Sequence, residues 1–223
     1  MAFDKTVAHG ALVDILDALN GDRRLGTGFR LLDDAIATSC RCLPRPTGTI
    51  RLPDPDVPGI LVLVRMRKLG TTSAAFAVVA RADPFSGLAL LTPSSAAGLG
   101  VPEELNPLIS PRALIDGLEP CQPELTPNWS GPVSIWSGDA WVEGTACQSA
   151  CSLSSRNDRL PSTALGAPVF TPAGRVVGLV RSIDEAGSGA SLCSLADHLP
   201  GWLLRSSSGD GRDPDGAVGP VAR

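Results

Sequence analysis

The chain has 223 residues, a net charge of −4 and 43% hydrophobic residues, which is enough to bury a globular core as one compact unit. It contains no cluster of Lys and Arg, so we expect neither a nucleic-acid partner nor an anionic membrane surface. The longest dense apolar run, 60–64, is far too short to span a bilayer.

Six cysteines are too dilute for a disulfide scaffold, and the first residues do not form a secretory signal. We therefore expect reduced thiols and a cytoplasmic location. Cys40-Arg41-Cys42 and Cys147-x-x-x-Cys151 raise zinc binding as an alternative. Neither has the Cys-x-x-Cys spacing of a structural site, and no histidine is near in sequence. We expect buried free cysteines, with no metal and no cofactor.

Apolar residues near the N-terminus recur at helical spacing and predict an amphipathic helix of about three turns within segment 1–24. The residues are Val7, Ala11, Leu12, Ile15, Leu16 and Leu19. Asn20-Gly21 supplies a C-terminal stop. We expect this helix to pack on the chain's own core, the alternative being a partner-binding helix.

From Leu25 onward the pattern changes to short strands separated by turns, which predicts a domain over 25–205. A first barrel, roughly 25–95, would be built from strands at 28–32, 35–38, 59–65, 74–80 and 88–91. A proline-rich crossing covers 92–128. A second barrel, roughly 117–195, would use 133–136, 141–146, 168–170, 175–181 and 191–194. A short helix over 195–204 follows, and 206–223 has the composition of a disordered tail or linker.

Four segments, in order, resemble those of trypsin-like serine proteases of bacterial type. Gly26–Phe29 resembles the strand that opens the first barrel, and Ile36–Leu43 the run that carries the catalytic histidine. Val78–Leu91 is similar to the run that carries the catalytic aspartate. Ser162–Phe170, with the hairpin to Val180, resembles the nucleophile segment. The resemblance implies an all-β fold of two six-stranded antiparallel barrels, with an N-terminal and a short C-terminal helix.

The same resemblance places the catalytic triad on residues that lack its chemistry. The histidine position falls on Arg41, whose guanidinium stays protonated and cannot act as a base. The aspartate position falls on Gly87, and the serine position on Leu165, which has no nucleophilic atom. Thr163 replaces a glycine whose backbone freedom serves the oxyanion hole, so we expect that site to be degenerate as well.

No displaced residue restores the triad in the sequence. Both histidines lie in predicted helices, and the available Ser, Asp and Cys residues do not stand at the required positions. These residues are His9, His198, Ser137, Ser162, Asp83, Cys147 and Cys151. The Asp-Pro at 83–84 is more simply interpreted as the start of a turn.

We therefore expect an inactive protease homologue, or pseudoprotease, that acts as a binding or scaffold domain in a larger intracellular system. It would hold a protein or extended peptide in the cleft between the barrels by strand addition. Arg41 in that cleft would favour an acidic or C-terminal carboxylate ligand, unless it merely points to solvent. The alternatives are an active serine endopeptidase with a non-standard site, and a purely structural subunit that uses its two terminal segments.

Overall fold

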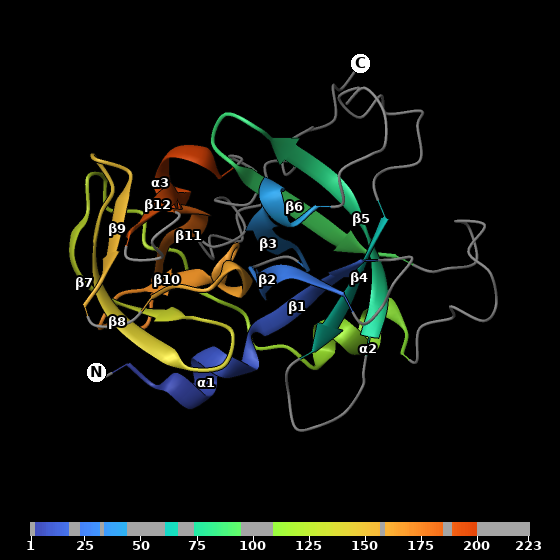
Figure 1. The fold of residues 1–223 in the computed structure, drawn as a ribbon. Coiled ribbons are helices and arrows are strands. Elements are labelled where there is room, and N and C mark those ends of the chain that lie inside the picture. Colours follow the sequence, from blue (N-terminus) through green and yellow to red (C-terminus); the bar gives the residue numbers. More distant parts are fainter. Residues whose placement is uncertain are drawn as a thin grey trace, which may run out of the picture.

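The structure of the chain is a computed structural model, in which two barrels lie side by side (Figure 1). The structure describes residues 3–17, 23–31, 34–43, 61–66, 74–94, 109–156, 159–184 and 189–199. The predicted tail at 206–223 lies outside these ranges.

The first barrel closes in the order β1-β2-β3-β6-β5-β4, with antiparallel pairing between neighbours. Its strands are β1 (Leu12–Asp17), β2 (Arg24–Arg30), β3 (Ile36–Ser39), β4 (Leu61–Met66), β5 (Ala74–Asp83) and β6 (Leu88–Pro93). The predicted hairpin is present as β2 and β3, in which Gly28 faces Thr38 and Arg30 faces Ile36.

The second barrel closes in the order β10-β11-β12-β9-β8-β7. Its strands are β7 (Ser130–Trp136), β8 (Trp141–Cys147), β9 (Ser152–Ser155), β10 (Pro168–Phe170), β11 (Val176–Ile183) and β12 (Gly189–Ser194). β9 was not predicted, because Leu153 is its one buried side chain among serines. The two closed six-stranded barrels confirm the expected fold class.

The N-terminal segment differs from the prediction, because only α1 (Lys5–Gly10) is helical and β1 follows directly. Asp4 caps the helix by accepting from the N–H groups of Thr6 and Val7. Residues 12–16 are buried, because β1 pairs with both β2 and β4 inside the first barrel. The three-turn helix and the domain boundary at 24/25 were therefore wrong, and the first barrel begins at Leu12.

A short helix packs on each barrel. α2 (Pro111–Asp116) lies in the proline-rich crossing and packs on the first barrel, whose core Leu114 and Ile115 join (Figure 1). It begins with a Ser110 cap and a proline in the first turn. α3 (Leu195–His198) packs beside β11 and β12 of the second barrel, and Leu199 is extended. The rest of the predicted 195–204 helix lies outside the described residues.

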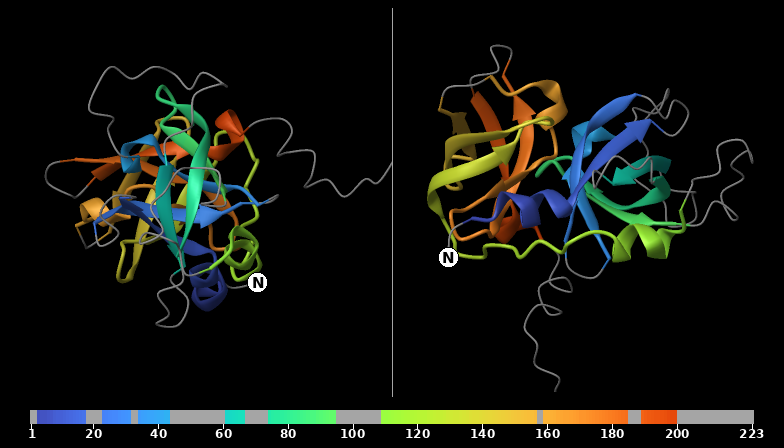
Figure 2. Two further views of the ribbon diagram at one scale, coloured as in Figure 1. Left: turned by 90° about the vertical axis from the view of Figure 1, so that its right-hand side faces the viewer. Right: turned by 90° about the horizontal axis from the view of Figure 1, so that it is seen from below.

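α1 connects the barrels, lying across their junction while β1 enters the first barrel (Figure 2). Phe3 packs edge-to-face on Trp141 and also against Phe170, with centroid separations of 5.2 and 5.1 Å. Lys5 pairs with Glu143 at 2.8 Å. The His9 ring lies 4.9 Å from that of Trp136. The N-terminal helix is therefore docked on the second barrel of its own chain.

Two truncations separate the roles of α1 and β1. A chain lacking residues 1–10 should keep both barrels and lose about 2 kcal/mol of unfolding free energy, the scale of the aromatic burial around Phe3. A chain lacking residues 1–17 also loses β1 and should not unfold cooperatively. Urea unfolding followed by circular dichroism measures both. Equal stability of the two truncations would contradict the place of β1 in the barrel.

Candidate functional site

The residues at the predicted triad positions meet where the two barrels touch. β3 leads into the 3-10 helix η1 (Cys40–Cys42), which carries Arg41. The N–H of Cys40 donates to the Gly87 carbonyl at 2.8 Å, so the second position lies beside the first. The N–H of Thr27 on β2 donates to the Leu165 carbonyl at 2.8 Å, which fixes the third position against the first barrel.

Leu165 lies at the junction as a packing residue. It is half-buried and contacts the hydrophobic cores of both barrels. Gly166, which follows, has φ +76 and leaves no room for a side chain, because a Cβ there would collide with the Thr27 carbonyl and the Thr38 hydroxyl. The turn at 165–166 is therefore held tightly between the barrels, with an alkyl group at its apex.

The Gly87 position is filled by a residue that sequence reasoning missed. Gly87 has φ +84, and a Cβ built on it would lie 2.7 Å from Cγ and 3.0 Å from Nε of Arg181. Arg181 is on β11, and its carbonyl accepts from the Ser39 hydroxyl at 3.1 Å. The Arg181 side chain therefore occupies the space into which an aspartate at position 87 would grow. The available signal was a charged residue directly after the buried run Val176–Val180.

The segment at the predicted oxyanion position forms the 3-10 helix η4 (Ser162–Ala164). The N–H of Leu165 donates to the Ser162 carbonyl at 3.1 Å, so this donor is engaged within the turn. The Thr163 hydroxyl donates to the Ser137 carbonyl at 3.1 Å. The Thr163 carbonyl accepts from the Thr27 hydroxyl at 2.9 Å and from Arg24 Nη2 at 3.2 Å.

Arg24 is the second residue that sequence reasoning missed. Its Nε lies 2.9 Å from the buried carboxylate of Asp14, and its other donors reach Thr27, Thr163 and Gly138. Arg65 contacts the same carboxylate at 3.1 Å. Arg24 therefore joins β1, β2 and the η4 turn of the second barrel by charge-assisted hydrogen bonds.

The cysteines near this junction lie in surroundings that raise the pKa of their thiols. Burial raises the pKa of Cys42 to about 11 and that of Cys193 to about 12, and it also raises the pKa of Cys40. Cys42 faces Gly26, where a Cβ would collide with its sulfur, and all six cysteines are free. Within the described ranges, no three His, Cys, Asp or Glu side chains are grouped to hold a metal ion.

The histidines, serines and aspartate considered as substitutes for the triad do not pair as base and nucleophile in the described part of the chain. His9 is on α1 against Trp136, and His198 ends α3. The Ser86 hydroxyl lowers the pKa of Asp83, with a smaller effect from His198, but Ser86 Oγ itself points to the Asp83 carbonyl at 3.4 Å within its own turn. The Ser137 hydroxyl donates to the Ala140 carbonyl at 2.9 Å.

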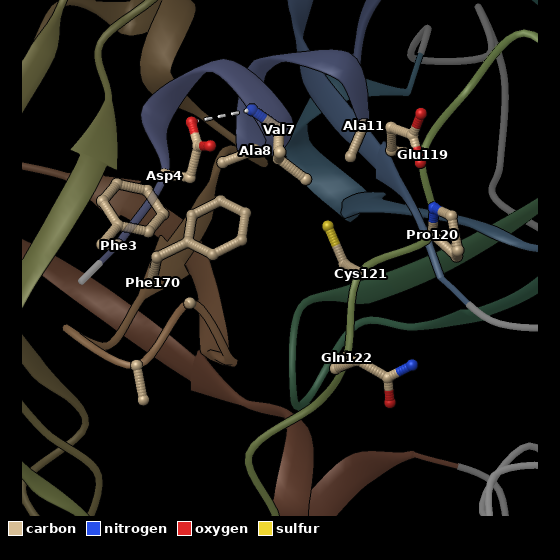
Figure 3. A pocket seen from close by; sticks show the side chains of 12 residues that line it. Phe3, Asp4, Val7, Ala8, Ala11, Glu119, Pro120, Cys121, Gln122 and Phe170 are labelled. Carbon is tan, nitrogen blue, oxygen red and sulfur yellow. Dashed lines mark hydrogen bonds between the residues drawn. The ribbon is translucent and has the colours of Figure 1, made fainter. Parts of the chain in front are cut away.

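A cavity of about 410 Å³ lies on another side of the barrel junction, below α1 (Figure 3). Phe3 and Phe170 form one wall, and the linker from Glu119 to Gln122 forms the opposite side. Its lining is mainly apolar, and of its two carboxylates, Asp4 and Glu119, the first is engaged in capping α1. The cavity includes none of the predicted triad positions.

Comparisons with solved structures show the fold of trypsin-like serine proteases. The human pathogenic astrovirus serine protease matches with a TM-score of 0.51 and 20% identity, over 89% of this chain and 98% of the protease. The serine endoprotease from Yersinia pestis gives a TM-score of 0.58 and 15% identity, over 91% of this chain and 65% of that one. An inactive serine-to-alanine mutant of Rv3671c from M. tuberculosis H37Rv gives a TM-score of 0.51 and 14% identity, over 93% of this chain and 92% of that one.

No protein-family model matches the chain, and no curated protein is similar in sequence. Among the helices that the structure describes, none combines the length and the apolar character that crossing a bilayer requires. At these low identities the structural matches show the fold alone.

A double-mutant cycle tests whether Arg181 fills the Gly87 position. Gly87→Ala should cost about 2 kcal/mol or more in the wild-type background, because the positive φ adds strain and the new Cβ meets Arg181. In an Arg181→Ala background the collision is gone, and the cost should fall by about 1 kcal/mol. Urea unfolding of the four proteins gives the coupling energy. Additive costs would show that the two residues do not share this space.

Arg24 and its neighbour Arg23 form a matched pair for testing the junction. Arg24→Ala should lower the unfolding free energy by about 3 kcal/mol. The substitution removes one of the two arginines that pair with the buried Asp14 carboxylate and leaves Arg65. Arg23→Ala removes an exposed ion pair with Asp17 at 3.8 Å and should cost less than about 0.5 kcal/mol. Chemical denaturation measures both, and equal effects would contradict the role of Arg24.

Proposed function

We propose that this chain, with the fold of a trypsin-like protease, is catalytically inactive and acts as a binding or scaffold domain. The main support is which residues lie at the barrel junction. The segments that carry Arg41, Gly87 and Leu165 lie there, and Arg181 lies over Gly87. A working triad needs a nucleophile, a base that takes its proton and an acid that orients the base. An alkyl group, a guanidinium and a bare backbone supply none of these functions.

The backbone around Leu165 also supports inactivity. Acyl transfer needs N–H donors directed at the point where an oxyanion develops. Here the Leu165 N–H is bonded to the Ser162 carbonyl, and the η4 turn is tied to Arg24 and Thr27. Freeing this donor would require breaking contacts that join the two barrels. Loss of the side-chain chemistry is therefore accompanied by loss of the electrostatic site.

The retained core favours a use for the scaffold other than catalysis. β10 and β11 keep the buried apolar side chains of the second barrel, including Val169, Phe170 and Val177. In this proposal the segments that join the strands at the barrel junction hold an extended peptide by backbone pairing without cutting it. The six free cysteines are in keeping with the reducing, intracellular setting that we propose for this binding role.

A fluorophosphonate probe tests the inactivity directly. The purified chain should remain unlabelled under conditions that label an active trypsin-like protease in full, and it should not cleave a mixed peptide library. Both expectations follow from the absence of a nucleophile–base pair at the barrel junction. Mass spectrometry of the protein and of the library is the measurement.

Labelling or cleavage would need a control to identify its origin. The hydroxyl groups to be replaced are those of Ser39, Ser86, Ser137, Ser162 and Thr163. Activity that disappears when one of them is replaced by alanine would overturn the proposal and favour an endopeptidase with a non-standard site. Activity that survives all five replacements would point to a contaminating protease.

A further inference from the structure

Two arginines stand on neighbouring backbone segments of the two barrels, beside the predicted triad positions. Arg41 is on η1 of the first barrel and Arg181 is on β11 of the second. Both are linked to the hydroxyl of Ser39, which accepts from the Arg41 N–H at 3.2 Å and donates to the Arg181 carbonyl at 3.1 Å. We call these two residues the arginine pair.

The side chains of the arginine pair differ in their surroundings. Arg41 is exposed. Arg181 is half-buried and lies with Cγ, Cδ and Nε over the backbone of Gly87. The packed stem of Arg181 reduces the conformational freedom that its guanidinium would lose on binding a ligand. The junction therefore presents one pre-positioned guanidinium and one adaptable guanidinium.

The local charge balance is positive. Within the described part of the chain, neither member of the arginine pair forms an ion pair with a carboxylate. Asp83 is the neighbouring acid: besides burial, its charge raises the pKa of Cys40 and Cys193, and the charge of Arg181 lowers it. Asp83 accepts from the N–H of Phe85 at 2.9 Å, and the Ser86 hydroxyl lowers its pKa. Asp83 thus lies in the surroundings of Arg181, and His198 is a further cationic group that acts on it.

We propose that the arginine pair binds a carboxylate of an acidic, extended peptide. This inference rests on the proposed binding function and names the ligand's chemistry. Guanidinium groups bind carboxylates through paired, charge-assisted N–H···O bonds, and a carboxylate between the two arginines also relieves their mutual repulsion. A site that handles a proton in an active protease has here become a fixed cationic site, which suits recognition rather than acid–base chemistry. The carboxylate comes from a Glu or Asp side chain or from the peptide's C-terminus.

Fluorescein-labelled peptides of alternating Val and Glu provide the probe, because Val-rich alternation favours an extended chain. The matched peptides carry Gln in place of Glu, and each is made with a free and with an amidated C-terminus. We expect Val-Glu peptides to bind at least about tenfold more tightly than their Val-Gln counterparts, and binding to weaken with salt. A requirement for the free C-terminus instead identifies the terminal carboxylate as the ligand group.

Three variants connect this binding to the arginine pair. Arg41→Gln removes the exposed charge, and Arg181→Met keeps an unbranched stem over Gly87 while removing the charge. Each should weaken Val-Glu binding about tenfold or more. Arg112→Gln, on the exposed surface of α2 and paired with Asp116, is the control and should leave binding unchanged. Fluorescence anisotropy gives the Kd values, and thermal unfolding checks each fold.

The outcomes separate this inference from the proposed function. Equal binding of Glu and Gln peptides, both with amidated ends, would overturn the inference and leave a neutral peptide-binding domain. Binding of no probe, or loss of binding in Arg112→Gln as in the other two variants, would also overturn it. Cleavage of any peptide would overturn the proposed inactivity, whatever the arginine variants do.

Discussion

The contact between the barrels depends on how buried backbone carbonyls and one buried carboxylate are satisfied at their junction. Each closed barrel pairs its strands internally, so the hydrogen bonds between the barrels come from side chains and from backbone groups at turns. Arg24 supplies several at once, to the carbonyls of Gly138 and Thr163 and to the Asp14 carboxylate. Thr27 extends this set by donating to the Thr163 carbonyl and by its N–H contact with Leu165. Orientation of the barrels and conformation of the 162–165 turn are thereby coupled.

This coupling explains how the positions of a catalytic centre can serve stability. Leu165 contacts both hydrophobic cores, and Arg181 packs over a glycine whose φ suits few other residues. The alkyl side chain of Leu165 favours burial at the junction, because it removes apolar surface from water.

Most of the barrels could be predicted from the sequence, because strands such as β10 and β11 combine apolar runs with Pro and Gly at their turn. β1 could not, since Leu12–Leu16 is covered on both faces and an unbroken apolar run does not distinguish strand from helix. α2 was missed although Ser110-Pro111 is a helix-start pattern. At the candidate site, the assignment of Arg41, Gly87 and Leu165 to triad positions comes from flanking motifs and stays a prediction. The roles of Arg24 and Arg181 depend on partners in the other barrel, and no local pattern shows those partners.

The docking of α1 also bears on the order in which the protein is assembled during synthesis. Phe3 leaves the ribosome well before Trp141 and Phe170, which form the site where it docks. Domains generally fold as units in N-to-C order during translation. The aromatic ring of Phe3 therefore stays uncovered while the first barrel forms, and its docking has to wait for the second barrel.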